Sequence, residues 1–200
     1  MFYIVKNNVG ALLKMSIPVK IENMVSAITL DIKIDLPKFV GKVKGIEYNA
    51  NRFPGAIFRV REPKLAMLIF SSGKVICTGA RSKKDIKAAV EHLVDKLKEG
   101  GIKLDRKPTF RKGVDVQNIV ASSDVGFKVN LDQLAMECWN TEYEPEQFPG
   151  LVYRLDEPKT VMLIFRSGRM IITGAKDPKN IKVAAEKTRQ MIQSYNAIIP

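Results

Sequence analysis

The fold of this chain is decided by residues 53–80, FPGAIFRVREPKLAMLIFSSGKVICTGA, because this stretch occurs a second time. The second copy covers residues 148–175 and reads FPGLVYRLDEPKTVMLIFRSGRMIITGA, at an offset of 95 positions without a gap. The match extends outside the stretch, since Asn23 and Asn118 lie at the same offset. Self-similarity at one fixed period indicates a duplicated structural module.

The duplication predicts a first repeat at residues 17–107 and a second at 108–200, after an N-terminal extension at residues 1–16. The extension starts with apolar residues, but polar residues and a glycine interrupt it before it reaches the length of a signal-peptide core. The sequence leaves open whether Met1 or Met15 is the start.

Each module reads as strands followed by a helix. Residues 56–60, 65–70 and 74–78 have strand character, and a turn at 71–73 joins the last two into a hairpin. A short helix is expected near residues 37–43. A long helix follows, because apolar residues recur at helical spacing until two glycines end the pattern. Its apolar stripe contains Ile86, Ala89, Val90, Leu93, Val94 and Leu97, and in the second copy Ile181, Ala184, Ala185, Thr188 and Ile192.

One face of the predicted sheet has no helix to cover it. The strand at residues 65–70 is apolar on both faces, which usually means that both are buried. One long and one short helix per module cover only one face of an antiparallel sheet. The other face would carry a hydrophobic patch larger than monomers usually tolerate, so it is either a binding surface or a dimer interface. Its residues are Leu68, Phe70, Ile76 and Thr78, with Leu163, Phe165, Ile171 and Thr173.

The charge of the chain favours a polyanionic partner. Its 200 residues include 33 Lys and Arg against 21 Asp and Glu, a formal net charge of +12. Such a balance is typical of proteins that bind nucleic acid or an anionic membrane. Residues 1–100 carry 18 basic and 9 acidic groups, whereas residues 101–200 carry 15 and 12. No stretch of the sequence is long enough to span a bilayer, so no membrane partner is expected.

The sequence contains no pattern that indicates catalysis or a cofactor. Cys77 and Cys138 lie far apart, without a CxxC pair or a histidine cluster, so neither zinc binding nor a disulfide framework is expected. Cys77 reads as a small buried apolar residue, and His92, the single histidine, as a surface residue. Nucleotide-binding loops and paired catalytic carboxylates are missing as well. We therefore expect no enzyme activity, metal or cofactor.

The repeated blocks, the asparagines of IENMV and VQNIV, and the segment YEPEQFPG together resemble the TATA-binding protein family, especially its archaeal-type members. The resemblance covers about Ile17 to Tyr195. It implies an α+β fold, a saddle of two pseudo-symmetric repeats with one curved antiparallel sheet and helices on the convex face. It also implies a general transcription factor that binds and bends the minor groove of an A/T-rich TATA box. Such a protein is expected in the cytoplasm with the nucleoid in an archaeon, and in the nucleus in a eukaryote.

An apolar sheet face suits the minor groove of A·T base pairs. That groove offers acceptors from A and T, and G·C pairs add the amino donor of G, so a surface with few acceptors excludes G·C. Residues at repeat-related positions resemble the floor of the DNA site. They are Asn23, Val25, Leu68, Ile76 and Thr78, with Asn118, Val120, Leu163, Ile171 and Thr173.

The resemblance also assigns residues at the ends and edges of the DNA site. The aromatic pairs Phe53 with Phe70 and Phe148 with Phe165 match the wedges that insert beside base steps. The candidates for phosphate contacts, which position the protein without reading sequence, are Arg52, Arg59, Ser72, Lys74, Arg154, Ser167 and Arg169.

An acidic segment in the second repeat matches the loop that binds transcription factor B in the family. Glu144, Glu146 and Gln147 are the expected contacts, and RNA polymerase would be recruited indirectly. The aligned residues of the first repeat are Asn49 and Asn51, so the acidic pair is missing there. This asymmetry would let the partner choose one half of a nearly two-fold complex and so set the direction of transcription.

Two other functions remain open at this stage. The open sheet face could instead bind a protein, in which case the chain would show no preference for A·T duplex. A detached accessory domain of a nucleic-acid enzyme is a third interpretation, but it predicts one module rather than two. The sequence leaves open whether the DNA-free protein dimerises through its sheet, which promoters it uses, and whether it is a main factor or a paralogue.

Overall fold

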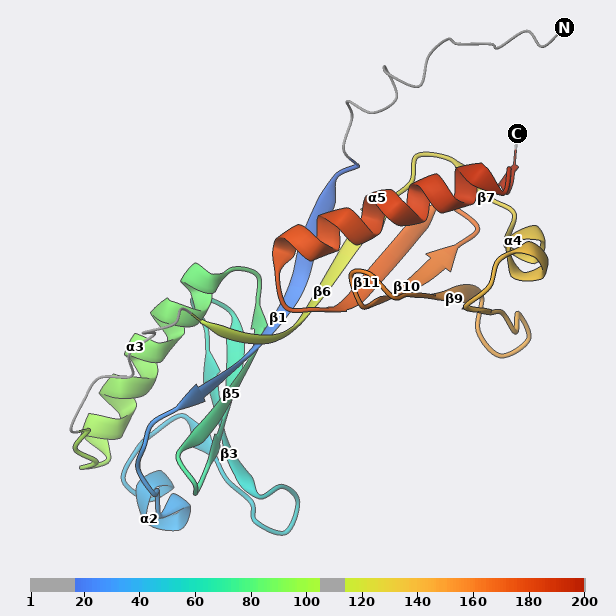
Figure 1. The fold of residues 1–200 in the computed structure, drawn as a ribbon. Helices are drawn as coiled ribbons and strands as arrows, with labels where there is room; N and C mark the ends of the chain where they lie inside the picture. The colour runs from blue at the N-terminus through green and yellow to red at the C-terminus, as the bar shows by residue number, and fades with distance from the viewer. Residues whose placement is uncertain (1–16, 105–113, 200) are drawn as a thin grey trace, which may run out of the picture. The chain divides into compact units, whose positions relative to one another are not determined.

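The structure is a computed structural model that describes residues 17–104 and 114–199 (Figure 1). The predicted extension at residues 1–16 and the predicted boundary after residue 107 lie outside these residues and stay predictions. The elements are β1 (Val19–Thr29), α2 (Leu36–Val40), β2 (Ile46–Glu47), β3 (Gly55–Val60), β4 (Leu65–Phe70), β5 (Lys74–Ala80), α3 (Lys83–Glu99), β6 (Asp115–Asp124), β7 (Lys128–Val129), α4 (Leu131–Glu137), β8 (Thr141–Glu142), β9 (Gly150–Leu155), β10 (Thr160–Phe165), β11 (Arg169–Ala175), α5 (Pro178–Ser194) and β12 (Ile198–Ile199).

Hydrogen bonds link ten of these strands in the order β2-β3-β4-β5-β1-β6-β11-β10-β9-β8, and β12 pairs with β7. The hairpins of the two repeats have the same antiparallel register. Gly55 is opposite Phe70 in the first repeat, and Gly150 is opposite Phe165 in the second. The predicted α+β class and the antiparallel arrangement of two repeats are confirmed.

The chain forms two compact units whose boundaries differ from those of the sequence repeats. The first unit contains Ile21–Ala121 together with Gly174–Asp177. The second unit contains, among the described residues, 17–20, Ser122–Thr173 and 178–199. Most of β6, which belongs to the second repeat by sequence, therefore packs in the first unit.

In the first unit, α3 lies along one face of the strands (Figure 1). The helix starts with a capping box, in which Ser82 Oγ accepts from the backbone of Asp85 and the Asp85 carboxylate accepts from the backbone of Ser82. The stripe predicted from the sequence, from Ile86 to Leu97, is buried as expected, while His92 is exposed. Burial also raises the pKa of the Cys77 thiol to about 11, consistent with the predicted apolar role of this residue.

In the second unit, α5 covers one face of the strands in the same way (Figure 1). Its predicted stripe is buried, including Thr188, whose hydroxyl donates to the Ala184 carbonyl at 2.8 Å. The shorter α4 is capped by Asn130, whose side chain accepts from the backbone N–H of Gln133. Among the described residues, no helix is both long and apolar enough to cross a membrane.

The short helix of the first repeat differs slightly from its prediction. It was expected near residues 37–43, but α2 covers Leu36–Val40. The Asp35 side chain caps its start by accepting from the backbone N–H of Lys38, and Pro37 occupies the first turn, where a missing N–H costs little.

Candidate nucleic-acid interface

Strand pairing in the first unit aligns the predicted floor residues in rows on the face opposite α3. Leu68 is directly opposite Ile57 on one side and Ile76 on the other, and Ile76 is opposite Ala27. These side chains are half-buried, whereas their neighbours along each strand are buried under the helices. We call the half-buried side of each unit's strands its open face. Ile57 and Ala27 were missed by the sequence analysis, although strand alternation could have found them.

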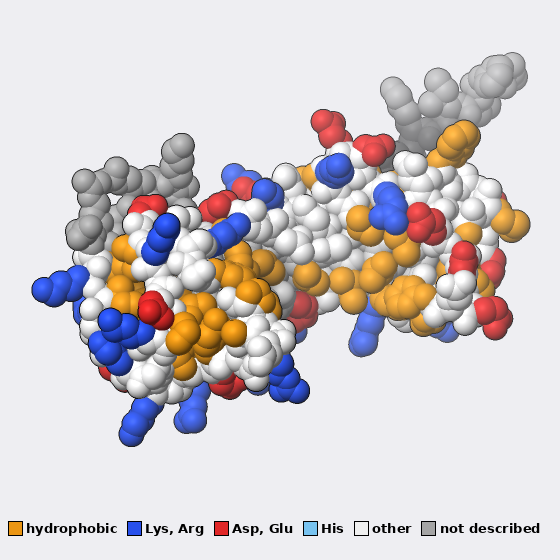
Figure 2. Space-filling model, turned by 90° about the horizontal axis from the view of Figure 1, so that it is seen from below, with side chains coloured by type: hydrophobic (Ala, Val, Ile, Leu, Met, Phe, Trp, Pro, Cys, Tyr) orange, Lys and Arg blue, Asp and Glu red, His pale blue; other side chains and the backbone are white. Residues whose placement is uncertain are grey.

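The second unit has the same kind of row. Leu163 is opposite Val152 and Ile171, and all three are half-buried. Figure 2 views this unit from the side away from α5, and hydrophobic side chains gather on the surface there. Val25 on β1 and Val120 on β6 are half-buried too, but both belong to the first unit.

The four predicted wedge residues form two matched aromatic pairs. The rings of Phe53 and Phe70 are 5.7 Å apart at an interplanar angle of 63°, and those of Phe148 and Phe165 are 5.9 Å apart at 65°. Such edge-to-face pairs are favourable arrangements of aromatic rings. Phe148 is 39% exposed even though it is a large apolar side chain.

A glycine under each pair gives the rings room to approach the strand. A Cβ at Gly55 would lie 2.8 Å from Phe53 Cε1 and 3.2 Å from Phe70 Cε1. A Cβ at Gly150 would lie 2.6 Å from Phe148 Cε1 and 3.0 Å from Phe165 Cε1. Both glycines belong to the repeated FPG motif, which could have identified them from the sequence. The steric reason for a glycine at these positions is visible only in the structure.

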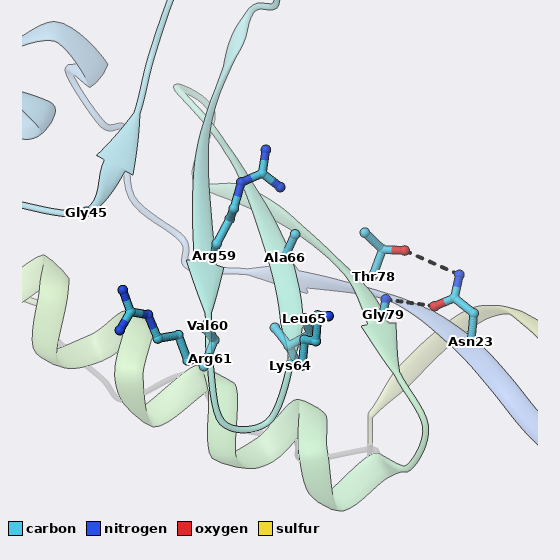
Figure 3. A pocket seen from close by; sticks show the side chains of 10 residues that line it. All are labelled: Asn23, Gly45, Arg59, Val60, Arg61, Lys64, Leu65, Ala66, Thr78 and Gly79. Carbon is cyan, nitrogen blue, oxygen red and sulfur yellow. Dashed lines mark hydrogen bonds between the residues drawn. The ribbon is translucent and has the colours of Figure 1, made fainter.

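The two predicted floor asparagines have their oxygens engaged by backbone. Asn23 Oδ1 accepts from the N–H of Gly79 at 2.7 Å, and its amide nitrogen lies 3.4 Å from the Thr78 hydroxyl (Figure 3). Asn118 Oδ1 accepts from the N–H of Gly174 at 2.9 Å. Because a backbone N–H requires an acceptor, these bonds fix the amide orientation, so the NH₂ group of each Asn points away from that N–H.

A cleft of about 770 Å³ lies beside Asn23 in the first unit (Figure 3). Arg59 lines this cleft together with Arg61 and Lys64, two cations that the sequence analysis did not select. Lys64 belongs to the EPK segment that occurs in both repeats, which was a usable signal. The cleft therefore combines amide and hydroxyl groups with three positive charges.

The predicted phosphate contacts are exposed residues near the strand edges and turns. Arg59 Nε lies 3.6 Å from Glu47 Oε1, and Arg154 Nη2 lies 3.3 Å from Glu142 Oε1, so both are paired with a glutamate of an edge strand. In the hairpin turns, Ser72 Oγ and Ser167 Oγ each accept from the backbone two residues later, at 3.4 Å. Arg52, Lys74 and Arg169 are exposed.

The acidic segment of the second repeat is an exposed turn. The Glu144 carbonyl accepts from the backbone N–H groups of both Gln147 and Phe148, each at 2.9 Å. Glu144, Glu146 and Gln147 are exposed, and the same turn is made in the first repeat around the Asn49 carbonyl. One turn thus connects the acidic residues to a wedge residue. Within the described part of the chain, no cluster of three or more potential metal-binding side chains occurs.

The family model described as transcription factor TFIID, or TATA-binding protein, matches residues 18–100 and 113–195. The chain belongs to the TATA-binding protein family. The two matches coincide with the two repeats that carry the aromatic pairs and the asparagines.

Named relatives of the TATA-binding protein family are similar over nearly the whole chain. The TATA-box-binding protein of Archaeoglobus fulgidus is 47% identical over 178 residues, which are 88% of this chain and 95% of that protein. The one from Pyrococcus horikoshii is 43% identical over 183 residues, 92% of this chain and 94% of that protein. A solved structure, of Methanococcus jannaschii TBP, is 44% identical with a TM-score of 0.80, and the match covers 88% of this chain and 98% of that one.

Proposed function

We propose that this protein is a general transcription initiation factor that binds the minor groove of an A/T-rich TATA box with its open faces and bends the DNA. The observation that carries the proposal is the pair of repeated sites, each with an apolar strand row and an aromatic pair. Family membership and the names of the archaeal relatives support the same function.

The chemistry of the open faces fits A·T base pairs. Their half-buried rows are aliphatic, with Leu68 and Ile76 in one unit and Leu163 and Ile171 in the other. The Asn23 oxygen is occupied by Gly79 and one of its N–H groups is directed to Thr78, so the second N–H of this amide would donate to the acceptors at adenine N3 and thymine O2. The amino group of guanine would meet aliphatic side chains with no acceptor and lose its hydrogen bonds to water.

The aromatic pairs supply the bend. Insertion of apolar side chains between base steps is the established mode of this family, and unstacking costs about a few kcal/mol per step, offset by the larger wrapped surface. Phe148, at 39% exposure, is already presented to solvent, and the ring contact with Phe165 orients it. The ring pair is therefore organised before DNA arrives, which lowers the ordering cost on binding.

Basic residues at the edges position the DNA backbone. Arg59 and Arg154 are held by ion pairs whose side chains are more than half exposed, and such pairs contribute only ~0–1 kcal/mol. A phosphate can therefore displace the glutamate at small cost. These contacts raise affinity for any duplex, whereas the rows and the asparagines give the preference for A·T.

The acidic turn is the proposed contact for transcription factor B, through which RNA polymerase is recruited. Glu144 and Glu146 are exposed and suit basic side chains on that partner. The aligned Asn49 and Asn51 carry no charge, so the partner would join one half of the complex.

The deciding experiment measures bending of an end-labelled TATA duplex by fluorescence resonance energy transfer. The wild type is compared with a Phe148→Ala/Phe165→Ala variant, and a duplex with G·C substitutions is the control. We expect bending of the A·T duplex alone, and its loss in the variant. Equal binding of both duplexes without bending would contradict the proposal and favour an open face that binds protein. Circular dichroism of the variant checks that it is folded.

A further inference from the structure

The turn that joins β10 to β11 carries a positive charge that the matching turn of the first repeat lacks. Residues 166–169 read RSGR, whereas residues 71–74, at the same offset of 95 positions, read SSGK. The last residue of each turn is a cation, so the added charge is that of Arg166, which is aligned with Ser71. The sequence analysis did not select Arg166.

Hydrogen bonds hold the backbone of the Arg166 turn on both sides. The Gly168 N–H donates to the Phe165 carbonyl at 2.9 Å and closes the turn. The Val129 N–H, from β7, donates to the Arg166 carbonyl at 2.9 Å. The Val125 N–H donates to the Gly168 carbonyl at 3.0 Å. Arg166 therefore projects from a turn that neighbouring segments keep in place.

The turn of the first repeat has the same frame. The Gly73 N–H donates to the Phe70 carbonyl at 2.9 Å, and the Ile34 N–H donates to the Ser71 carbonyl at 2.9 Å. The Leu30 N–H donates to the Gly73 carbonyl at 3.0 Å. Each donor and each acceptor lies 95 positions before its counterpart in the second repeat. The two turns thus present different side chains, serine and arginine, from the same backbone position.

Arg166 lies next to the second aromatic pair and has no carboxylate partner. It directly follows Phe165, whose ring centre is 5.9 Å from that of Phe148. Its side chain is exposed, and within residues 17–104 and 114–199 no hydrogen bond or ion pair engages its guanidinium. Arg154, in contrast, is paired with Glu142. An anion could therefore bind Arg166 without displacing a carboxylate.

We propose that Arg166 binds a DNA phosphate beside the base step at which Phe148 and Phe165 insert, so that the second repeat makes one backbone contact more than the first. This inference rests on the proposed function. A guanidinium presents a planar set of donors that can bind one phosphate through two hydrogen bonds. Because such a contact reads no base, Arg166 raises the affinity for every duplex and leaves the preference for A·T unchanged.

The added contact makes the two ends of the DNA site unequal. The wedge pairs and the strand rows occur once in each repeat, whereas the cation of Arg166 occurs in the second repeat alone. The DNA end on the second repeat is therefore held more tightly. This inequality belongs to the protein itself and needs no partner.

Two substitutions exchange the single difference between the turns. Arg166→Ser gives the second turn the residue of the first, and Ser71→Arg gives the first turn the residue of the second. The affinity for a TATA duplex is measured by anisotropy between about 50 and 200 mM salt. The full-length protein is used throughout.

The salt dependence of the affinity counts the phosphate contacts. With Arg166→Ser, the slope of log K against log salt should become less steep by about 0.9, because one contact is lost. Binding should weaken by about tenfold at the lowest salt and by about threefold at the highest. Ser71→Arg should make the slope steeper by about 0.9, and the double variant should return to the slope of the wild type.

A matched control removes the same charge elsewhere. Lys182 is an exposed residue of α5, which covers the opposite face of the strands, so Lys182→Gln should leave the slope unchanged. All variants should bend the TATA duplex as the wild type does, measured by energy transfer, and should keep its ratio of A·T to G·C affinity. Circular dichroism checks that they are folded.

An Arg166→Ser slope equal to that of Lys182→Gln would overturn the inference, as would a Ser71→Arg slope equal to that of the wild type. A wild type that neither bends DNA nor prefers A·T would instead contradict the proposed function. In that case the slopes, measured on the same duplexes, still decide whether Arg166 contacts a phosphate. The two failures are therefore distinguishable.

Discussion

The two repeats are alike where they form a core or an open face, and they differ where a loop meets solvent. Their aromatic pairs have ring separations of 5.7 and 5.9 Å, and a Cβ on the glycine below each pair would come within 2.8 and 2.6 Å of a ring carbon. The turns after β2 and β8 make the same backbone hydrogen bonds, yet residues 36–52 carry +3 and residues 131–147 carry −5.

This difference indicates which parts of a duplicated module are free to diverge. A strand row, a ring pair and a capped helix depend on packing, so a change in one residue disturbs several neighbours. An exposed side chain on a turn has few neighbours, and its charge can be reversed at little cost to stability. The charges of the two turns therefore differ although their backbones are alike, and we expect a protein partner to distinguish the two repeats by that charge.

The largest expected effect on stability concerns the two cores, in which aligned residues are equally buried. Ile86 on α3 and Ile181 on α5 are both fully buried at aligned positions. Replacing either by alanine should lower the free energy of unfolding by about 2–5 kcal/mol, because buried methyl groups are lost and a cavity is left. Urea denaturation followed by circular dichroism measures this. A loss below about 1 kcal/mol in one variant only would break the equivalence.

The glycines below the aromatic pairs provide the next test. Gly55→Ala and Gly150→Ala should each displace a ring pair, since the new Cβ would approach a ring carbon to 2.8 or 2.6 Å. We expect DNA affinity to fall by about 2 kcal/mol, roughly thirtyfold, with less bending at one end. Gly41→Ala is the control, because its Cβ would have no neighbour closer than 3.4 Å. Unchanged energy transfer in both variants would refute the steric role.

The asparagines can be tested with their bonds to the backbone N–H groups kept. In Asn23→Asp and Asn118→Asp, the carboxylate can still accept from Gly79 or Gly174, but the amide donors disappear. Affinity for an A·T duplex should fall by about tenfold, ~1.4 kcal/mol, in each variant. Anisotropy titration with a TATA duplex measures it. A loss confined to one variant would show that the two repeats read DNA unequally.

Exchanging the charges of the turns after β2 and β8 tests whether these charges make the two repeats differ in partner binding. Glu144→Asn with Glu146→Asn should weaken recruitment of transcription factor B to the DNA complex by about fivefold, on the order of 1 kcal/mol, since exposed charge pairs are weak. The reciprocal variant, Asn49→Glu with Asn51→Glu, should create a second recruitment site. Gel mobility of the ternary complex distinguishes the two orientations. Unaltered recruitment in the first variant would remove the acidic turn from the partner surface.

The smallest effect is expected at the edge-strand ion pairs. Glu142→Gln and Glu47→Gln release Arg154 and Arg59 and remove a negative charge near the predicted phosphate contacts. Affinity for any duplex should rise by less than about fivefold, because exposed pairs contribute at most ~1 kcal/mol. The dependence of log K on log salt should steepen slightly. A decrease in affinity would mean that these glutamates position the arginines for DNA.

Much of the fold follows from the sequence because the repeat supplies two examples of most elements, β7 and β12 being exceptions. The helical stripe from Ile86 to Leu97 and its counterpart on α5 are buried as predicted, since spacing alone defines a helix face. The short helix is less well predicted. Side-chain caps such as Asp35 set its limits, and they depend on backbone geometry.

The candidate site, too, was only partly predictable from the sequence. The aromatic residues, asparagines and floor residues were selected from the sequence, and the structure places them on the open faces, while their DNA contacts stay predictions. Ile57, Ala27, Arg61 and Lys64 were missed, because they join the site only through cross-strand pairing or through the shape of a cleft.

By itself, the sequence determined that this protein is a duplicated α+β module of the TATA-binding protein family with an uncovered strand face. Periodicity and repetition are properties of the chain, and they survive without coordinates. Only the tertiary structure decided that Gly55 and Gly150 make room for the ring pairs, that Gly79 orients the Asn23 amide, and that Val125 and Val129 hold the turn of Arg166. Each of these depends on atoms brought together from separate strands and helices, whose distances no local pattern specifies.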